Sequence, residues 1–228
     1  MVEPISRASD RVAAQLRRAL LTGTWPVGAR LPPERTLAET LGVNRLTLRA
    51  ALAQLEAQGL IRARQGDGVR VLDLRTSGSL DLLGDLVALG DKGLVADLLG
   101  VRRAVAAEAV ALAVARATPT DLAHIEALAD LQGAEADPRA FLMRDLELGR
   151  AVVRAARSLP MELLMNALAP VYRDHPHLPD ALFGHADAVR RSYQGVVALL
   201  RAGDPEAARS AVQHTLQIID TLTLEALP

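Results

Sequence analysis

Helix-start signals recur through the last two thirds of this 228-residue chain. Each signal pairs a side chain that caps the first turn of a helix with a proline that fits its first position. Three such pairs are Thr118-Pro119, Asp137-Pro138 and Asp204-Pro205. Between the signals, apolar residues recur every three or four positions, and no stretch alternates as a strand does. The pattern predicts seven helices over residues 80–228, which short connectors arrange as an antiparallel bundle.

The composition limits what the chain can be. Apolar residues make up 50% of it and aromatic residues 2%, which suits a helical protein with one large core or two smaller ones. Cysteine is absent, so disulfide frameworks and thiol chemistry are excluded. The sequence has neither an apolar run of membrane-spanning length nor an apolar segment near its start. We therefore expect a cytoplasmic protein without a membrane partner.

Charge is unevenly divided along the chain. Residues 1–75 hold 12 Lys and Arg against 7 Asp and Glu, whereas the remainder holds 14 against 20. Lys92 is the one lysine, and arginine presents a planar fork of donors that suits phosphate and guanine. This division predicts that the first third of the chain, and not the rest, contacts a polyanion.

Two short helices joined by a tight glycine turn are predicted between residues 33 and 57. Pro33 fits the first position of one helix, Gly42 ends it, and Asn44 can cap the next. The second helix carries a buried stripe and, beside it, an arginine face, formed by Leu48, Leu52 and Leu55 and by Arg45 and Arg49. Such a pair of helices is typical of a helix-turn-helix, whose second helix enters the major groove of DNA.

A β-hairpin is predicted directly after these helices. Residues 61–64 and 69–71 alternate apolar and basic side chains, and Gln65-Gly66-Asp67-Gly68 between them is a turn sequence that needs glycine. Three arginines are expected to point outward from it: Arg62, Arg64 and Arg70.

The expected organisation is therefore mainly α, with a winged helix-turn-helix over residues 1–73, a linker over 74–79 and the helical domain over 80–228.

Three elements of the first domain stand in order at a characteristic spacing: Leu31-Pro32-Pro33-Glu34-Arg35-Thr36-Leu37-Ala38, Arg45-Leu46-Thr47-Leu48-Arg49 and Gly66-Asp67-Gly68. With these elements the domain resembles the GntR family of bacterial regulators over about residues 10–72. The resemblance implies DNA contacts by Arg35, Asn44, Arg45, Thr47, Arg49 and Gly66. Leu46 and Ala50 depart from the family pattern, which bears on the operator sequence. The alternatives are a surface ion pair of Arg35 with Glu34 or Glu39, and a purely structural turn at Gly66.

The second domain has a Thr76-Ser77-Gly78 entry, seven expected helices and the phrase Leu199-Leu200-Arg201-Ala202-Gly203-Asp204. On these features it resembles, over roughly residues 78–226, the ligand-sensing domain of the FadR-type branch of that family. Many members hold a divalent metal there with one Asp and three His. In this chain Asp145 matches the acidic position, but Gly149 and Tyr193 stand where His is expected, and the last position falls on His214 or Thr215. The resemblance therefore implies no metal cofactor. It is nearer to the fatty-acyl-CoA-responsive regulator of the branch, which implies a long apolar acid as effector.

Five polar residues of the helical domain are candidate effector contacts: Arg102, Asp145, Tyr172, Tyr193 and His214. Arg102 lies in an apolar stripe, and an unpaired buried charge is costly, so it needs a partner or a ligand anion. Asp145 is the candidate partner, which leaves a purely structural pair as the alternative. For the tyrosines and His214 the alternative is an ordinary core position.

The favoured interpretation is a transcriptional repressor or activator that binds a palindromic DNA operator as a homodimer. A small molecule in the helical domain would bias the spacing of its two DNA-binding heads. A metal-dependent sensor of a small carboxylate, with Asp145 and His214 as ligands, is the alternative within this class. An architectural DNA-binding protein without an effector is the alternative outside it. The sequence has no phosphate-binding glycine loop and no nucleophile elbow, so we expect no enzyme.

Overall fold

The computed structural model describes residues 8–64, 66–131 and 137–227. The chain divides into two compact units, Met1–Asp85 and Leu86–Pro228. Each unit has its own buried core, as expected for separate domains. Among the described residues, no helix is long and apolar enough to cross a membrane.

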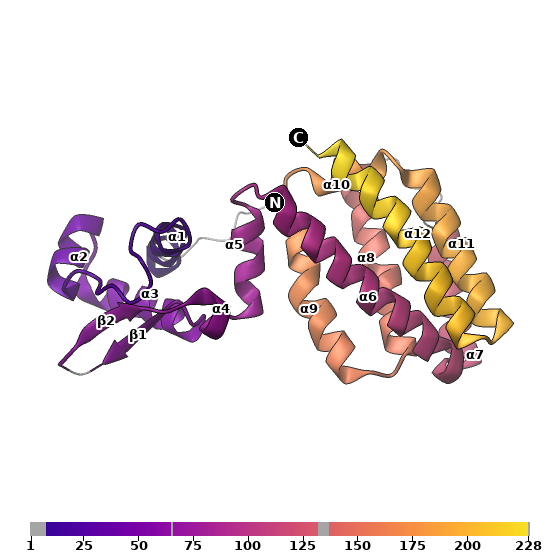
Figure 1. The fold of residues 1–228 in the computed structure, drawn as a ribbon, viewed down its shortest axis with the longest axis horizontal. Helices are drawn as coiled ribbons and strands as arrows, with labels where there is room; N and C mark the ends of the chain where they lie inside the picture. The colour runs from indigo at the N-terminus through magenta and orange to yellow at the C-terminus, as the bar shows by residue number, and fades with distance from the viewer. Residues whose placement is uncertain (1–7, 65, 132–136, 228) are drawn as a thin grey trace. The chain divides into compact units, whose positions relative to one another are not determined.

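The first unit is a small helical core followed by a two-stranded hairpin (Figure 1). Its elements are α1 (Ala8–Leu21), α2 (Glu34–Leu41), α3 (Arg45–Ala57), β1 (Ile61–Arg64), β2 (Gly68–Val71), α4 (Leu74–Ser77), the 3-10 helix η1 (Leu80–Leu82) and α5 (Leu83–Val87), which contains the boundary between the units. The core forms where α1 and α3 pack together, around Leu16, Leu48 and Leu55. The hairpin pairs Ile61 with Val71 in antiparallel register. The predicted winged helix-turn-helix is confirmed.

The segment predicted to be a linker, residues 74–79, is folded into the first unit. Asp73 caps α4 by accepting a hydrogen bond from the amide of Arg75 at 2.9 Å. The Ser77 hydroxyl donates to the carbonyl of Gly59 at 2.8 Å, and the Ser79 amide donates to the carbonyl of Gln58 at 3.1 Å. The structure differs from the linker prediction because the bonds of Ser77 and Ser79 reach Gly59 and Gln58, which are distant in sequence, and hold a segment that looks like a loop.

Gly59 allows the backbone of Ser77 in α4 to lie close to its own, and its replacement is a first test of the fold. A Cβ at Gly59 would lie 1.8 Å from the carbonyl oxygen of Ser77, and the residue has a φ of 72°. We expect Gly59→Ala to lower the free energy of unfolding by roughly 1–3 kcal/mol more than Gly42→Ala in urea titrations. Gly42 is the matched control, since its φ is 65° but a Cβ there meets nothing within 4 Å. Equal losses would mean that the contact with α4 is easily displaced.

The second unit is an all-helical bundle, which agrees with the predicted fold class. Its helices are α6 (Lys92–Arg116), α7 (Pro119–Leu131), α8 (Pro138–Ala155), α9 (Leu159–Asp174), α10 (Leu178–Phe183), α11 (Ala186–Ala202) and α12 (Pro205–Ala226). Figure 1 shows α6 and α12 side by side along most of their length. Asp137 and Asp204 cap α8 and α12 through their side chains, as their Asp-Pro sequences predict.

Two of the predicted helices differ from the structure. The first, expected over residues 80–90, is the short pair η1 and α5. The one expected after Pro179 is divided into α10 and α11, because Gly184 ends α10 and the backbone of His185 leaves helical geometry at φ −118° and ψ 27°. Glycine has a low helix propensity, but Gly149 and Gly195 lie inside continuous helices, so the apolar pattern alone does not indicate where this break falls.

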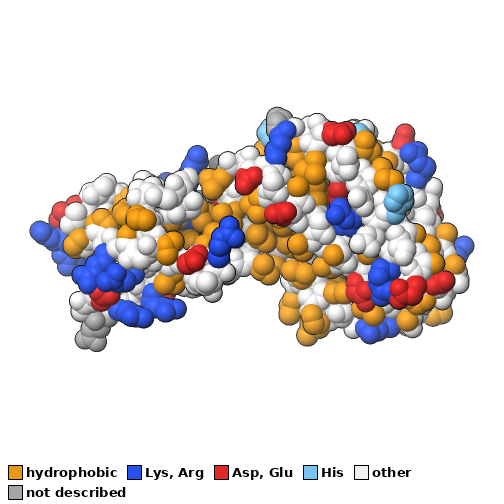
Figure 2. All heavy atoms as spheres, viewed as in Figure 1, with side chains coloured by type: hydrophobic (Ala, Val, Ile, Leu, Met, Phe, Trp, Pro, Cys, Tyr) orange, Lys and Arg blue, Asp and Glu red, His pale blue; other side chains and the backbone are white. Residues whose placement is uncertain are grey.

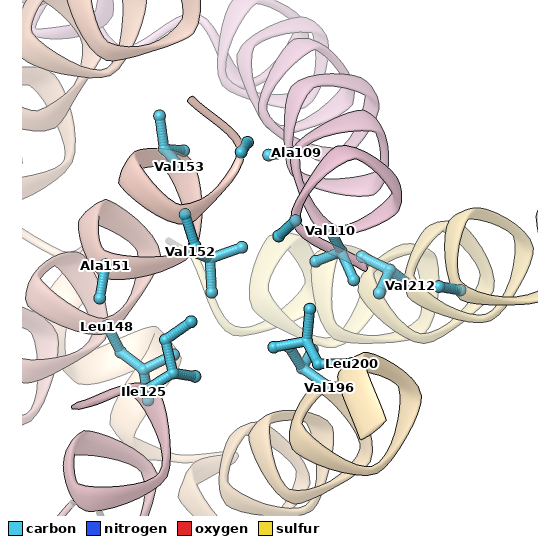
Figure 3. Packing of buried hydrophobic residues seen from close by; sticks show 14 of the residues in the cluster. Ala109, Val110, Ile125, Leu148, Ala151, Val152, Val153, Val196, Leu200 and Val212 are labelled. Atoms are coloured by element: carbon cyan, nitrogen blue, oxygen red, sulfur yellow. The ribbon is translucent and has the colours of Figure 1, made fainter. Parts of the chain in front are cut away.

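The core of the bundle is built from small aliphatic side chains. Figure 3 shows Val152 of α8, Val110 of α6, Val212 of α12 and Val196 of α11 directed toward a common interior. All four are at most 5% exposed. Branched and small side chains of this kind leave the helices close together but fill the centre of the bundle incompletely, and the cavity described below lies there.

Candidate functional site

The first turn of α3 carries exposed side chains on one face of the helix. Asn44 caps the helix, since its side-chain oxygen accepts a hydrogen bond from the amide of Thr47 at 2.8 Å. Arg45 and Arg49 are exposed, and Leu46 is 80% exposed. The opposite face of α3 is fully buried in the core through Leu48, Ala51 and Leu55. The predicted cap is therefore confirmed, and the arginines project from the side that the core leaves free.

Two of the predicted DNA-contacting arginines lie beside carboxylates. The Nε of Arg49 donates to Oε2 of Glu34 at 2.8 Å, and NH1 of Arg35 lies 3.9 Å from Oε1 of Glu39. These arginine side chains are 67% and 72% exposed, so the ion pairs are weak and easily exchanged for a phosphate or a base. Arg45 has no ion pair with any residue that the structure describes. Figure 2 shows basic side chains gathered over α2 and the hairpin of the first unit.

The tip of the hairpin is a charge-paired turn. Gly66 has a φ of 79°, which glycine adopts readily; Gln65, also predicted in this turn, lies outside the described residues. The carboxylate of Asp67 accepts from the Nε of Arg70 at 2.6 Å and also pairs with Arg30. The hydrogen bond from Arg70, with the charges of Arg30 and Arg70, lowers the pKa of Asp67 to about 2.

Arg70 does not point freely outward, as the alternation of its strand predicts. Besides Asp67, it donates to the carbonyl of Gly28 at 2.9 Å, so its guanidinium ties the hairpin to the segment before α2. Arg62 and Arg64 are exposed. The prediction failed for Arg70 because its partners, the carboxylate of Asp67 and the carbonyl of Gly28, cannot be identified from the strand pattern alone.

A cavity of about 120 Å³ lies inside the helical bundle. Its walls are mostly aliphatic and come from α6, α8, α9, α10, α11 and α12, and they include the five valines labelled in Figure 3. Its polar lining includes four of the five predicted effector residues: Arg102, Asp145, Tyr172 and Tyr193. An apolar cavity with a few convergent polar groups is the usual form of a small-molecule site.

Arg102 is paired, but not with the residue expected from the sequence. Its NH2 donates to Oδ1 of Asp220 on α12 at 2.6 Å, and Arg103 donates to Oδ2 of the same carboxylate at 2.5 Å. Asp220 is 3% exposed. Burial opposes the charge of Arg102, but Asp220 and the neighbouring Tyr172 outweigh it, and the pKa of Arg102 is raised. The Arg102–Asp145 pair is therefore corrected to an Arg102–Asp220–Arg103 cluster.

Asp145 forms a different pair within the cavity. Its Oδ1 accepts a hydrogen bond from the hydroxyl of Tyr193 at 2.8 Å. Burial raises the pKa of Asp145, while the charge of Arg102 and the Tyr193 hydrogen bond act in the opposite direction. The same burial raises the pKa of Tyr193 well above its usual value, so its hydroxyl stays protonated and donates. Asp145 and Arg102 thus face one small space with opposite charges and separate partners.

Tyr172 contacts the same polar region, whereas His214 does not. The Tyr172 hydroxyl donates to the carbonyl of Leu98 at 3.0 Å, and the guanidinium of Arg102 lies 5.9 Å from the centre of its ring. Burial raises the pKa of Tyr172 to about 12. His214, the fifth predicted effector residue, is exposed on α12 and does not line the cavity.

The residues at the expected metal positions do not form a ligand cage. Asp145, Gly149 and Tyr193 all line the cavity, but glycine has no side chain to donate and the tyrosine hydroxyl is committed to Asp145. Among the described residues, no group of three His, Asp or Glu side chains could hold a metal ion. Outside these positions, His175 of the segment His175-Pro176-His177 accepts hydrogen bonds at Nδ1 from the amides of His177 and Leu178, at the start of α10.

Comparison with known proteins divides the chain in the same way. The family of bacterial regulatory proteins named gntR matches residues 8–71, and the FCD domain family matches residues 97–217. The HTH-type transcriptional regulator Mce2R of Mycobacterium tuberculosis is 33% identical over 99% of this chain and 96% of its own length. A putative L-lactate dehydrogenase operon regulatory protein of Escherichia coli is 29% identical over 94% of this chain and 86% of its own length.

Solved structures support the fold. Lar, which controls the expression of the Listeria monocytogenes agr system, gives a TM-score of 0.64 at 17% identity. The match covers 99% of this chain and 100% of the Lar chain. Streptococcus agalactiae GntR gives a TM-score of 0.53 at 24% identity, over 93% and 99% of the two chains. The chain thus belongs to the GntR family of bacterial regulatory proteins, as a DNA-binding transcriptional regulator in which an FCD domain brings operator binding under small-molecule control.

Proposed function

We propose that α3 enters the major groove and that Arg35, Arg45, Thr47, Arg49 and the Gly66 turn contact the operator. The observation that carries this proposal is the exposed first turn of α3, capped by Asn44 and bearing Arg45 and Arg49 on its free face. In this arrangement Asn44 acts chiefly by shaping the turn, because its side-chain oxygen is used by the cap. The exposed Leu46 beside them suits contact with a thymine methyl group.

The proposed operator is an inverted repeat read by a homodimer. A helix-turn-helix monomer contacts only a few base pairs, and a twofold-symmetric pair of heads reads two half-sites about one helical turn apart. Selection of bound fragments from random double-stranded DNA should recover a palindrome with such spacing. Recovery of fragments without a common sequence would instead support the architectural DNA-binding alternative.

The cavity of the FCD domain is the proposed effector site. Effector binding would favour one arrangement of the dimer through different affinities for the DNA-competent and DNA-incompetent states. The volume of about 120 Å³ is of the order of the ~150 Å³ that holds a benzene ring in an engineered protein cavity. This favours an effector much smaller than the fatty acyl-CoA that the family resemblance implies.

We propose further that the effector binds without a metal ion. The support is the replacement of donor side chains by Gly149 and by the committed hydroxyl of Tyr193. We expect EDTA treatment, followed by dialysis, to leave the melting temperature and the effector response of operator binding unchanged. Native mass spectrometry of protein purified without chelators gives the second readout. One metal ion per subunit, or loss of the response after EDTA, would favour the metal-dependent carboxylate sensor.

We infer that the protein acts by binding rather than by catalysis, and that it does so in the cytoplasm. The support for the first point is that the curated relatives described above are named transcriptional regulators. The support for the second is that a bacterial operator is reached only there.

A further inference from the structure

The polar end of the cavity offers a cation and a carboxylate that form no salt bridge with each other. Arg102 reaches it from α6 and Asp145 from α8. Arg102 is bonded to Asp220, and Asp145 is bonded to a neutral hydroxyl, that of Tyr193. Two opposite charges that share a small, mostly apolar space without pairing leave one place for an anionic group and another for a cationic group.

The cationic side has unused capacity for a carboxylate. The Nε of Arg102 is buried and has no hydrogen-bond partner. Asp220 is shared by Arg102 and Arg103, so the cluster keeps one net positive charge. A buried donor without a partner costs free energy, and a carboxylate that accepts from a guanidinium is the usual remedy.

The anionic side has unused capacity for an ammonium group. Tyr193 donates to one oxygen of Asp145, and no described residue donates to the other. A protonated amine carries three donors and a positive charge, so it can satisfy the free oxygen and stabilise the ionised carboxylate. Burial raises the pKa of Asp145, and a neighbouring ammonium group would act in the opposite direction.

The other ligand classes fit this pair less well. A simple carboxylic acid would place its anion beside Asp145, and a simple amine would place its cation beside Arg102, so each would face one like charge. A divalent cation would meet Arg102 and would lack a donor at Gly149. The remaining walls are aliphatic, with Leu142, Val152 and Val196 among them, and they suit a branched hydrocarbon.

We propose that the cavity binds a small α-amino acid with an aliphatic side chain, with its carboxylate on Arg102 and its ammonium group on Asp145. The volume suits roughly six to nine non-hydrogen atoms, by comparison with cavities that hold benzene. This inference rests on the proposed function of the cavity as the effector site.

The test uses three probes for each of two carbon skeletons. L-valine and L-leucine are each titrated calorimetrically into the full-length protein, beside the analogue without the amino group and the analogue without the carboxylate. These analogues are 3-methylbutanoate and 2-methylpropylamine for valine, and 4-methylpentanoate and 3-methylbutylamine for leucine. We expect at least one amino acid to bind tenfold or more tightly than both of its analogues. Equal or tighter binding of either analogue, or no binding by any probe at millimolar concentration, overturns the proposal.

Asp145→Asn separates the charge of Asp145 from its shape. The variant should lower amino acid affinity at least tenfold and raise the affinity for the matched carboxylic acid, because the like charge is gone. Asp187→Asn is the control, since Asp187 lies on the surface of α11, with its side chain 78% exposed, and pairs with Arg190. Unchanged selectivity in Asp145→Asn would refute the assignment of the ammonium group.

Gly149→Leu distinguishes failure of this inference from failure of the proposed function. Gly149 lines the cavity on α8, so the new side chain fills space while all four polar residues stay in place. If a carboxylic acid rather than an amino acid changes operator affinity, and Gly149→Leu abolishes that effect, the effector site stands and its ligand class is wrong. If Gly149→Leu leaves the response of operator binding to any probe intact, the cavity is not the effector site.

Discussion

Asp220→Ala is expected to destabilise the FCD domain by about 3–5 kcal/mol, because it leaves two partly buried arginines without their common carboxylate. Asp220 is 3% exposed and holds Arg102 and Arg103 at 2.6 and 2.5 Å. The substitution therefore removes the one acidic group that neutralises this part of the interface between α6 and α12. Urea unfolding of the full chain, followed by circular dichroism, measures the loss.

The control for this prediction is an ion pair at the surface of the same domain. Asp187 pairs with Arg190 at 2.8 Å, but its side chain is 78% exposed, so Asp187→Ala should cost less than about 1 kcal/mol. A similar small loss for Asp220→Ala would mean that water or a rearranged side chain replaces the carboxylate. The Arg102–Asp220–Arg103 cluster would then contribute little to stability.

The double variant Arg45→Ala, Arg49→Ala is expected to lose about 2–6 kcal/mol of operator discrimination. Each arginine is proposed to contact a base edge, and one good contact is worth about 1–3 kcal/mol. The loss should appear as a smaller ratio between affinities for the selected operator and for scrambled DNA, measured by fluorescence anisotropy at fixed salt. The fold should be intact, since both side chains are exposed.

A variant with the same change of charge makes the result specific. Arg11→Ala, Arg18→Ala removes two exposed positive charges from α1 of the same unit. It should weaken binding to both DNAs similarly, because it alters only the general attraction to phosphate. If both double variants lower operator and scrambled affinities alike, α3 does not read the sequence.

Features of the fold that depend on neighbouring residues could be predicted from the sequence. The cap at Asn44, the turn at Gly66 and the Asp-Pro helix starts each require only residues a few positions apart, and the structure has all of them. The aliphatic walls of the cavity follow from the same periodicity that predicts the helices. The folded segment after β2 could not be predicted, because two of the bonds that hold it reach Gln58 and Gly59, which precede the hairpin.

The partners of charged groups were the least predictable part of the site. Asp220 lies 118 residues after Arg102, and helical periodicity does not indicate which turn of α12 packs against α6.

The position of His214 on α12, in contrast, was predictable in principle from helical spacing. Val212, Leu216 and Ile219 form the stripe of α12 that faces the cavity, and a residue two positions after Val212 lies on another side of the helix. The family pattern favoured His214, and the helical spacing argues against it.

The ion pair between Glu34 and Arg49 affects how salt should act on operator binding. In the free protein this arginine already has an acidic partner, at 2.8 Å, so it competes less for solution anions. Transfer of its guanidinium to DNA exchanges one partner for another and does not simply neutralise a phosphate. The number of ions released on binding should therefore be smaller than the number of arginines at the interface. Glu34 would thus make operator recognition less dependent on ionic strength, at some cost in affinity for DNA of any sequence.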